Sequence, residues 1–248
     1  MMRPLKDMAL ALQFMTRLPI QFESLDPSDL ERAAAWFPLV GVLIGGLASL
    51  LYRILIPHLQ RSLCALLVIL FLILITGGLH EDGLADCADA FGGAWTREDR
   101  LRIMKDSRIG SFGGIALILS LSSRVLLVAS IPVSQVTTYL ISAQALSRWT
   151  PLPLSAALPS ARGLEGQGGR LAGRTNGLTI IIGTLITAAV LWYLLRTAAW
   201  QPSLVALAVT LLSGAYYQRR IGGITGDCMG ATIQITEVAV YFCGVWNK

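Results

Sequence analysis

The chain has 248 residues, of which 54% are hydrophobic and only 14% are charged, and its mean hydropathy is +0.63. Soluble domains carry about 25% charged residues, so this composition excludes an ordinary soluble domain and predicts an all-α integral membrane protein. The net charge of +5 is not accompanied by any base-reading or base-stacking pattern, so we expect no nucleic-acid partner.

The first 33 residues precede the long apolar segments. Leu5, Met8, Leu12 and Met15 recur at helical spacing, while polar side chains interrupt the stretch and no small-residue cleavage site follows. A signal peptide is therefore not favoured. We predict a helix lying at the cytoplasmic face of the bilayer, with a short helix buried against the spans as the alternative.

Apolar segments of membrane-spanning length follow. A hydrocarbon core of roughly 30 Å needs about 20 apolar residues per helix. By this measure the sequence predicts about seven spans, near residues 34–56, 62–79, 111–132, 136–157, 178–195, 202–217 and 229–246. They occupy most of the chain, so residues 1–248 are expected to form a single membrane domain, a polytopic bundle with short cytoplasmic interfacial helices.

The four cysteines are Cys64, Cys87, Cys228 and Cys243. None of them is in a CxxC pair, and a membrane protein of this composition has no disulfide framework to maintain. We expect reduced thiols and no zinc site.

The charged residues are distributed unequally between the two sides of the predicted bundle. With the N-terminus inside, most lysines and arginines fall in inner segments, which is typical of cytoplasmic loops. All acidic residues except Glu237, which lies within a span, fall on the same side. Acidic residues do not determine topology, so their collection on one side predicts that the cytoplasmic face carries the functional site.

The most acidic segment is "GGLHEDGLADCADAFGG" at residues 77–93. If it is helical, Asp82, Asp86 and Asp89 stand at i, i+4 and i+7 on one face. Like charges at this spacing repel, and a bound Mg²⁺ or Mn²⁺ would remove the repulsion because hard cations prefer oxygen ligands. A solvated loop, or carboxylates paired with nearby arginines, is the alternative interpretation.

A basic segment, "TREDRLRIMKDSRIGSFGG", follows at residues 96–114. Thr96 and Asp99 resemble a capping pair that opens a short helix. Lys105 and Arg108 lie beyond that helix, and cations beside a metal–carboxylate cluster suit a diphosphate. Residues 77–110 are therefore the predicted catalytic segment.

A third polar element, "RRIGGITGDCMGATIQITE", covers residues 219–237. Within it, the glycine-rich motif at 219–231 holds Thr225 and Asp227 at the inner mouth of the last span, where backbone N–H groups can face phosphate. A simple turn into the span explains the motif nearly as well. Glu237 lies deeper, and the sequence leaves open whether it pairs with Arg124 or Arg148 or lines a polar cavity.

Several motifs together resemble one family. They are "FPLVGVLIG" (37–45), "GGLHEDGLADCADAF" (77–91), "MKDSRIGSFGG" (104–114), "SR" (147–148) and "GGITGDCMGA" (222–231). In order and spacing they resemble the cobalamin synthase family, the adenosylcobinamide-GDP ribazoletransferases. The resemblance implies a Mg²⁺-dependent enzyme of the bacterial inner membrane that joins adenosylcobinamide-GDP to α-ribazole, or to its 5′-phosphate, and releases GMP.

The resemblance also implies roles for particular residues. The catalytic set it predicts is His80, Asp82, Asp86 and Asp89, and the metal ligands are Asp82, Asp86, Asp89 and Asp227. The predicted substrate-binding residues are Lys105, Asp106, Arg108, Arg148 and Thr225. The general base stays open, because on an ideal helix His80 points away from the aspartates. One departure is Gln234, where family members often have glutamate.

Two other functions compete with this interpretation. CDP-alcohol phosphotransferases also use aspartates and a divalent cation, but "DGLADCADAFGG" lacks the Ala-Arg and the second spaced pair of their signature. A transporter would place its ionisable groups near the midplane, whereas nearly all the acids here collect at one surface. The sequence leaves open a homo-oligomer, the preference between α-ribazole and its phosphate, and the docking site of the corrinoid, for which we expect a lateral opening between spans.

Overall fold

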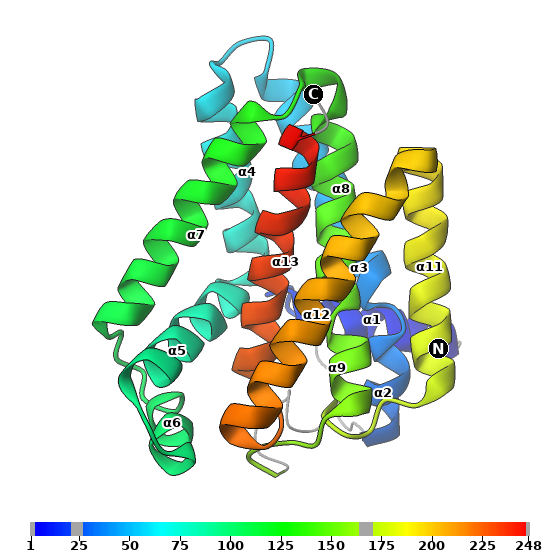
Figure 1. Cartoon of the computed structure of the whole chain (residues 1–248). Helices are drawn as coiled ribbons and strands as arrows, with labels where there is room; N and C mark the ends of the chain where they lie inside the picture. The colour runs from blue at the N-terminus through cyan, green and yellow to red at the C-terminus, as the bar shows by residue number, and fades with distance from the viewer. Residues whose placement is uncertain (1–2, 21–26, 164–170, 247–248) are drawn as a thin grey trace.

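The structure is a bundle of helices (Figure 1). This computed structural model describes residues 3–20, 27–163 and 171–246, and these ranges form helices, turns and one isolated parallel bridge between Ser160 and Ile224. The elements are α1 (Arg3–Met15), α2 (Pro27–Ala34), α3 (Phe37–Leu55), α4 (Arg61–Thr76), α5 (Leu79–Gly93), α6 (Arg97–Ile103), α7 (Ser111–Ser130), α8 (Val133–Trp149), α9 (Pro151–Ala157), α11 (Gly177–Leu195), η1 (Arg196–Ala199), α12 (Trp200–Ile221) and α13 (Gly226–Trp246). The predicted all-α membrane bundle is confirmed.

Fewer helical stretches meet the length and hydropathy of a membrane span than the seven spans that the sequence predicted. Four helical stretches of the described chain are long and apolar enough to cross a membrane, or up to five if α4 and α5 form one broken span. One of the four, residues 177–221, has 45 residues and would extend about 68 Å if straight, more than twice a hydrocarbon core. The turn η1 divides it, and α11 and α12 run antiparallel (Figure 1). The predicted seven spans are not confirmed, because α4 has only 16 residues and α8 is too polar to qualify.

The most extensive helix–helix contact of the described residues is between α3 and α8. Gly41 and Gly45 lie one turn apart on α3 and face α8, so that a Cβ on Gly45 would lie 2.7 Å from the Cα of Ile141. A Cβ on Gly41 would meet the carbonyl of Gln144. Small residues four apart let two helix backbones approach closely, which is how helices associate without a hydrophobic driving force in lipid.

The predicted N-terminal helix is present as α1. Leu10, Ala11 and Met15 are buried on one face, while Leu5 on the other is 58% exposed. Lys6 binds Asp29 of α2 at 2.7 Å. The helix therefore packs against the bundle along one face, as the alternative interpretation expected, and keeps an exposed apolar residue on the other.

A sharp turn separates α4 from α5. Gly77 and Gly78 both have positive φ, 69° and 72°, a conformation that side chains with a Cβ rarely adopt. The N–H of Gly78 donates to the carbonyl of Ile73 at 3.0 Å, which closes the end of α4. The two helices are bent by 89°, so α5 leaves the direction of α4 and lies at the end of the bundle where α6 and α9 also lie (Figure 1).

Candidate active site

The acidic segment is helical and forms α5, so the condition set for placing the three aspartates on one face is met. Asp82 is exposed, Asp86 is half-buried and Asp89 is 9% exposed. His80 and Glu81 are buried against the bundle. The helix therefore presents Asp82 and Asp86 outward from its packed side, while Asp89 is drawn into a protein contact.

The start of α13 lies directly against α5. A Cβ on Gly83 would lie 2.9 Å from the carbonyl oxygen of Asp227 and 3.0 Å from its Cα. A Cβ on Gly230 would lie 3.3 Å from the Cα of His80. The two glycines thus allow backbone contact between helices that are more than 130 residues apart in sequence, and this contact brings Asp227 to the predicted acidic cluster.

Negative charge is concentrated at this contact. Burial, and then the charges of Asp82 and Asp227, raise the pKa of Asp86 to about 7. Three carboxylates are therefore close enough to oppose one another's ionisation. Their oxygens are the donors that Mg²⁺ prefers. Within the described residues, however, no three His, Cys, Asp or Glu side chains already converge on a common metal position.

Arg162 is a member of this cluster that the sequence analysis did not single out. Its Nη1 lies 3.1 Å from Oδ2 of Asp227, and its side chain is only 15% exposed. Its positive charge also acts to lower the pKa of Asp86. The sequence offered one signal, its position in an inner loop rich in glycine, but it is separated by 65 residues from Asp227 and only the fold brings the two together.

Thr225 has a structural position next to Asp227. Its hydroxyl accepts from the N–H of Cys228 at 3.3 Å and donates to Oδ2 of Asp227 at 3.2 Å, and the residue is 2% exposed. Thr225 therefore caps the N-terminus of α13 and orients Asp227. It has no open face toward solvent from which to bind substrate directly.

Asp89 is engaged by the backbone of the following span. Its two carboxylate oxygens accept from the N–H of Gly110 at 2.7 Å and of Gly113 at 2.8 Å. These are donors at the N-terminus of α7, where a carboxylate is favoured by the helix dipole. Asp89 therefore holds α5 to α7, a role that Asp82 and Asp86 do not share.

The predicted basic motif forms an exposed loop after α6. Arg108 makes a two-oxygen ion pair with Asp106, and this hydrogen bonding lowers the pKa of Asp106 to about 2. Lys105 is exposed in the same loop. Asp106 and Arg108 line a cavity of about 500 Å³ whose other walls include Asp89 and Phe112. The loop is therefore adjacent to the acidic helix, as predicted, and borders a cavity with both charged and apolar walls.

The short helix α6 is fixed between these elements. Thr96 accepts from the N–H of Asp99 at 3.1 Å, which confirms the predicted capping pair. Arg97 donates to the carbonyls of Ile221 at 2.8 Å and Ala161 at 3.0 Å. Because these carbonyls lie at the end of α12 and beside Arg162, α6 holds the loop of Arg162 in place.

Arg148 lies inside the bundle and is 1% exposed, so the structure does not bring it to the acidic cluster. Its Nη1 is 3.5 Å from Oε1 of Glu237, and Arg124 lies 3.0 Å from the other oxygen of Glu237. A charged residue within a span costs about 2.5–3.5 kcal/mol on insertion scales unless it is paired. The question left open for Glu237 is thus answered by ion pairs with both arginines.

His80 is placed on the packed side of α5. It is 3% exposed, and burial together with the positive charges of Arg148 and Arg124 lowers its pKa well below the ordinary value. The imidazole is therefore neutral and faces away from Asp82. The argument that His80 points away from the aspartates of an ideal helix holds for Asp82, which is exposed while His80 is buried.

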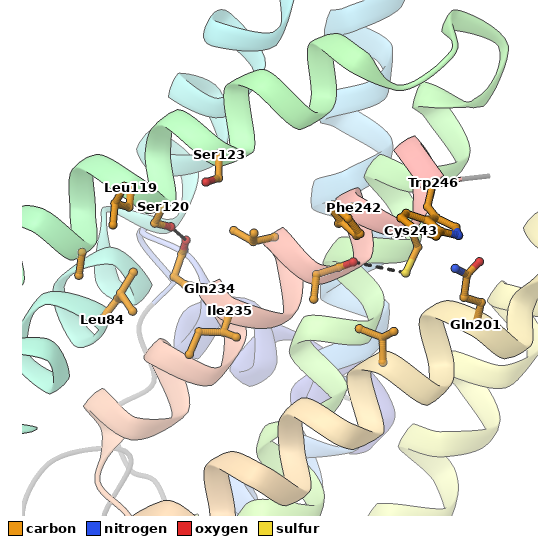
Figure 2. Close-up of a pocket in the computed structure, with 14 residues that line it drawn as sticks. Leu84, Leu119, Ser120, Ser123, Gln201, Gln234, Ile235, Phe242, Cys243 and Trp246 are labelled. Atoms are coloured by element: carbon orange, nitrogen blue, oxygen red, sulfur yellow. Dashed lines mark hydrogen bonds between the residues drawn. The ribbon is translucent and has the colours of Figure 1, made fainter. Parts of the chain in front are cut away.

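A lateral groove runs along the bundle from α5 to the C-terminal end of α13. It has a volume of about 670 Å³ and lies between α7, α12 and α13, with Leu84 of α5 at one end and Trp246 at the other. Figure 2 shows its mostly apolar side chains, with Ser120 hydrogen-bonded to Gln234 in the wall. An opening between spans was expected, and this groove begins within two residues of both Asp82 and Asp86.

The fold and the site together define a multi-pass helical membrane protein with a carboxylate cluster and flanking cations at one end of its bundle. This description fits a membrane enzyme acting on a phosphorylated substrate. The sequence matches the family described as cobalamin-5-phosphate synthase over residues 7–245, and the chain belongs to that family.

Curated relatives cover nearly the whole chain. A protein of Thermoanaerobacter pseudethanolicus named adenosylcobinamide-GDP ribazoletransferase is 34% identical over 246 residues, 98% of each chain. A protein of Shewanella frigidimarina with the same name is 37% identical over 248 residues, 97% of this chain and 94% of its own length. No solved structure matches the chain.

Proposed function

We propose that this chain is an adenosylcobinamide-GDP ribazoletransferase of the bacterial inner membrane, with its active site on the cytoplasmic side. The observation that carries the proposal is the meeting of Asp82, Asp86 and Asp227 with Arg162 at one end of an apolar bundle, in a chain of this family. The reaction joins adenosylcobinamide-GDP to α-ribazole or its 5′-phosphate and yields the complete cobalamin, or its 5′-phosphate, and GMP.

The proposed transfer replaces one phosphorus–oxygen bond with another. The ribose hydroxyl oxygen of the α-ribazole substrate forms a bond to the corrinoid-side phosphorus of the diphosphate. The bond from that phosphorus to the bridging oxygen breaks, GMP leaves with the bond's electron pair, and the hydroxyl proton is released. Transfer of this kind depends mainly on alignment and on stabilising charge at the phosphoryl oxygens.

Asp82, Asp86 and Asp227 are the proposed ligands of Mg²⁺. A half-buried carboxyl whose pKa is raised to about 7 by neighbouring carboxylates is a group that gains from a cation. Bound Mg²⁺ supplies Lewis-acid stabilisation of the diphosphate. Asp89, also predicted as a metal ligand, is better explained as the cap of α7, because both its oxygens already accept backbone hydrogen bonds.

Arg162 is the proposed partner of the diphosphate. Its guanidinium is paired with Asp227 and mostly buried. If Asp227 were to hold a cation, the fork of N–H donors of Arg162 would be available to phosphate oxygens. Lys105 and Arg108 lie on the exposed loop that borders the cavity of about 500 Å³, where they can hold the nucleotide phosphate. The proposed acceptor of the hydroxyl proton is a carboxylate of this cluster rather than the buried His80.

The corrinoid ring needs more space than the acidic helix offers. The lateral groove is lined mainly by apolar side chains, which suit lipid chains better than the amide-bearing edge of a corrin ring. We therefore expect the ring at the inner end of the groove, near Leu84, with its amides facing the aqueous side.

The test is a product assay with purified protein in lipid nanodiscs. Adenosylcobinamide-GDP, α-ribazole 5′-phosphate and Mg²⁺ are expected to give GMP in step with a complete corrinoid. Release of CMP from a CDP-alcohol would instead favour a CDP-alcohol phosphotransferase. Uptake of an unchanged corrinoid into vesicles, with no GMP, would favour a transporter.

A further inference from the structure

A charged network lies inside the bundle directly behind the acidic helix. Its centre is Arg124, in the middle of α7, which is 1% exposed. Nη1 of Arg124 lies 2.7 Å from Oε1 of Glu81, and Nη2 lies 3.0 Å from Oε2 of Glu237. With Arg148 beside Glu237, two buried cations balance two buried carboxylates. The network is thus neutral in net charge and connects α5, α7, α8 and α13.

Gln234 completes the contact with α5. Its side-chain oxygen accepts from Nη1 of Arg124 at 2.9 Å, and its Nε2 donates to Oε1 of Glu81 at 3.0 Å. Figure 2 shows the same side-chain oxygen accepting from Ser120 in the wall of the groove. One oxygen of Glu81 is therefore held by two donors from two different spans.

The position of Glu81 makes this contact relevant to the site. Glu81 precedes Asp82, and successive residues of a helix are separated by about 100° around its axis. Because Glu81 is anchored inward, the rotation of α5 is fixed, and with it the directions of Asp82 and Asp86. Asp89 holds the C-terminal half of α5 to α7, so the contact of Glu81 is the one that fixes the rotation of its N-terminal half, where Asp82 lies.

We propose that Arg124 is a positioning residue: through Glu81 it sets the rotation of α5 so that Asp82 and Asp86 face Asp227. It touches neither substrate nor the reacting atoms. The inference rests on the proposed function, because its consequence is the affinity of the carboxylate cluster for a divalent cation.

The test compares two conservative substitutions in the same network. Glu81→Gln and Glu237→Gln each remove one buried carboxylate from Arg124, but only the first loosens α5. Residues that orient metal ligands typically change metal affinity by about 10–100-fold when replaced. We expect Glu81→Gln and Arg124→Gln to raise the Mg²⁺ concentration for half-maximal turnover at least tenfold, and Glu237→Gln to change it less than threefold.

A second measurement does not depend on turnover. Binding of Mn²⁺, followed by its electron paramagnetic resonance signal, should weaken in Glu81→Gln by the same factor. Amide hydrogen exchange should increase in residues 79–93 and stay unchanged in the distal half of α7. Arg124→Lys, which keeps a point charge beside Glu81, should recover part of the loss.

Different outcomes would refute the proposed metal site and the positioning role of Arg124. If the native protein forms GMP without any divalent cation, the proposed metal site is wrong. If the native protein needs the cation but Glu81→Gln and Glu237→Gln shift its half-maximal concentration equally, the network is merely structural and the inference is overturned. Thermal unfolding in nanodiscs identifies variants that fail to fold, and for those Arg124→Lys provides the comparison.

Discussion

The close contact between α5 and α13 provides the sharpest test of the site's geometry. In Gly83→Ala the new Cβ would lie 2.9 Å from the carbonyl oxygen of Asp227 and 3.0 Å from its Cα. Ordinary contacts of this kind are about 3.4 Å or longer, and both neighbours are backbone atoms, so α5 and α13 must separate by about 0.5 Å.

Two effects of this separation follow. Overpacking of this kind costs typically about 1–3 kcal/mol of stability. Misplacement of catalytic groups by about 1 Å can cost about a hundredfold in rate, so half that displacement is expected to lower turnover about tenfold. The stability loss should also be visible as a lower Tm in nanodiscs.

The control is a glycine with open space around it. Gly46 of α3 is helical and has nothing within 4 Å of its Cβ position, so Gly46→Ala should leave turnover unchanged and raise stability by up to about 1 kcal/mol. Turnover, Mg²⁺ dependence and Tm would be measured for both variants. If Gly83→Ala turned over within twofold of the native protein, the argument that this contact sets the spacing of Asp227 and α5 would be refuted.

Three further predictions concern charges at the site. Arg162→Gln should raise the KM for adenosylcobinamide-GDP about tenfold or more, because a charged hydrogen bond contributes about 1.5–3 kcal/mol. An unchanged KM in steady-state kinetics would show that Arg162 does not bind the substrate. Without divalent cation, Asp86 has a pKa of about 7 in the folded protein, above its value in the unfolded chain, so the free energy of unfolding should fall as pH rises from about 4 to about 7. Mg²⁺ added at pH 8 should restore the lost stability. Calorimetric unfolding traces that do not change with pH would contradict this. Asp89→Ala removes both acceptors at the start of α7 and should cost about 0.5–2 kcal/mol in thermal unfolding, with the Mg²⁺ dependence of turnover retained.

Local patterns predicted much of the helical structure. The Thr96 and Asp99 pair predicted where α6 begins, and the expectation that Asp82 and Asp86 share one face depended on a helix, which α5 is. Both signals depend on residues within one or two turns, so the sequence contains them in full. The membrane class followed from composition alone.

Contacts between segments far apart in the chain could not be predicted from local sequence patterns. Arg162 meets Asp227 only because α6 and the end of α12 hold its loop, and nothing near Arg162 in the sequence indicates this. Asp89 shares a stripe with Asp82 and Asp86, yet the start of α7 takes its carboxylate, which periodicity within α5 does not predict. Arg148 was assigned to substrate from motif resemblance, whereas burial pairs it with Glu237.

The number of spans failed to follow from hydropathy for a related reason. Segments 62–79 and 136–157 were read as single spans. The first corresponds to α4, which ends at Thr76 before the 89° turn into α5, and the second divides into α8 and α9. Two buried polar side chains of α8 find partners on α13, since Gln144 donates to the Tyr241 hydroxyl at 3.2 Å and Arg148 pairs with Glu237, so a helix inside the bundle does not need the apolarity of one facing lipid.

The most direct measurement is GMP release as a function of Mg²⁺ concentration by the native protein and by Asp82→Ala and Asp86→Asn in nanodiscs. If these carboxylates coordinate the cation, turnover of the native protein should disappear with chelator and return with Mg²⁺. In both variants, turnover at saturating substrate should stay at least a hundredfold lower, which corresponds to a barrier about 2.7 kcal/mol higher. Near-native turnover and an unchanged Mg²⁺ dependence in Asp82→Ala and Asp86→Asn would contradict it.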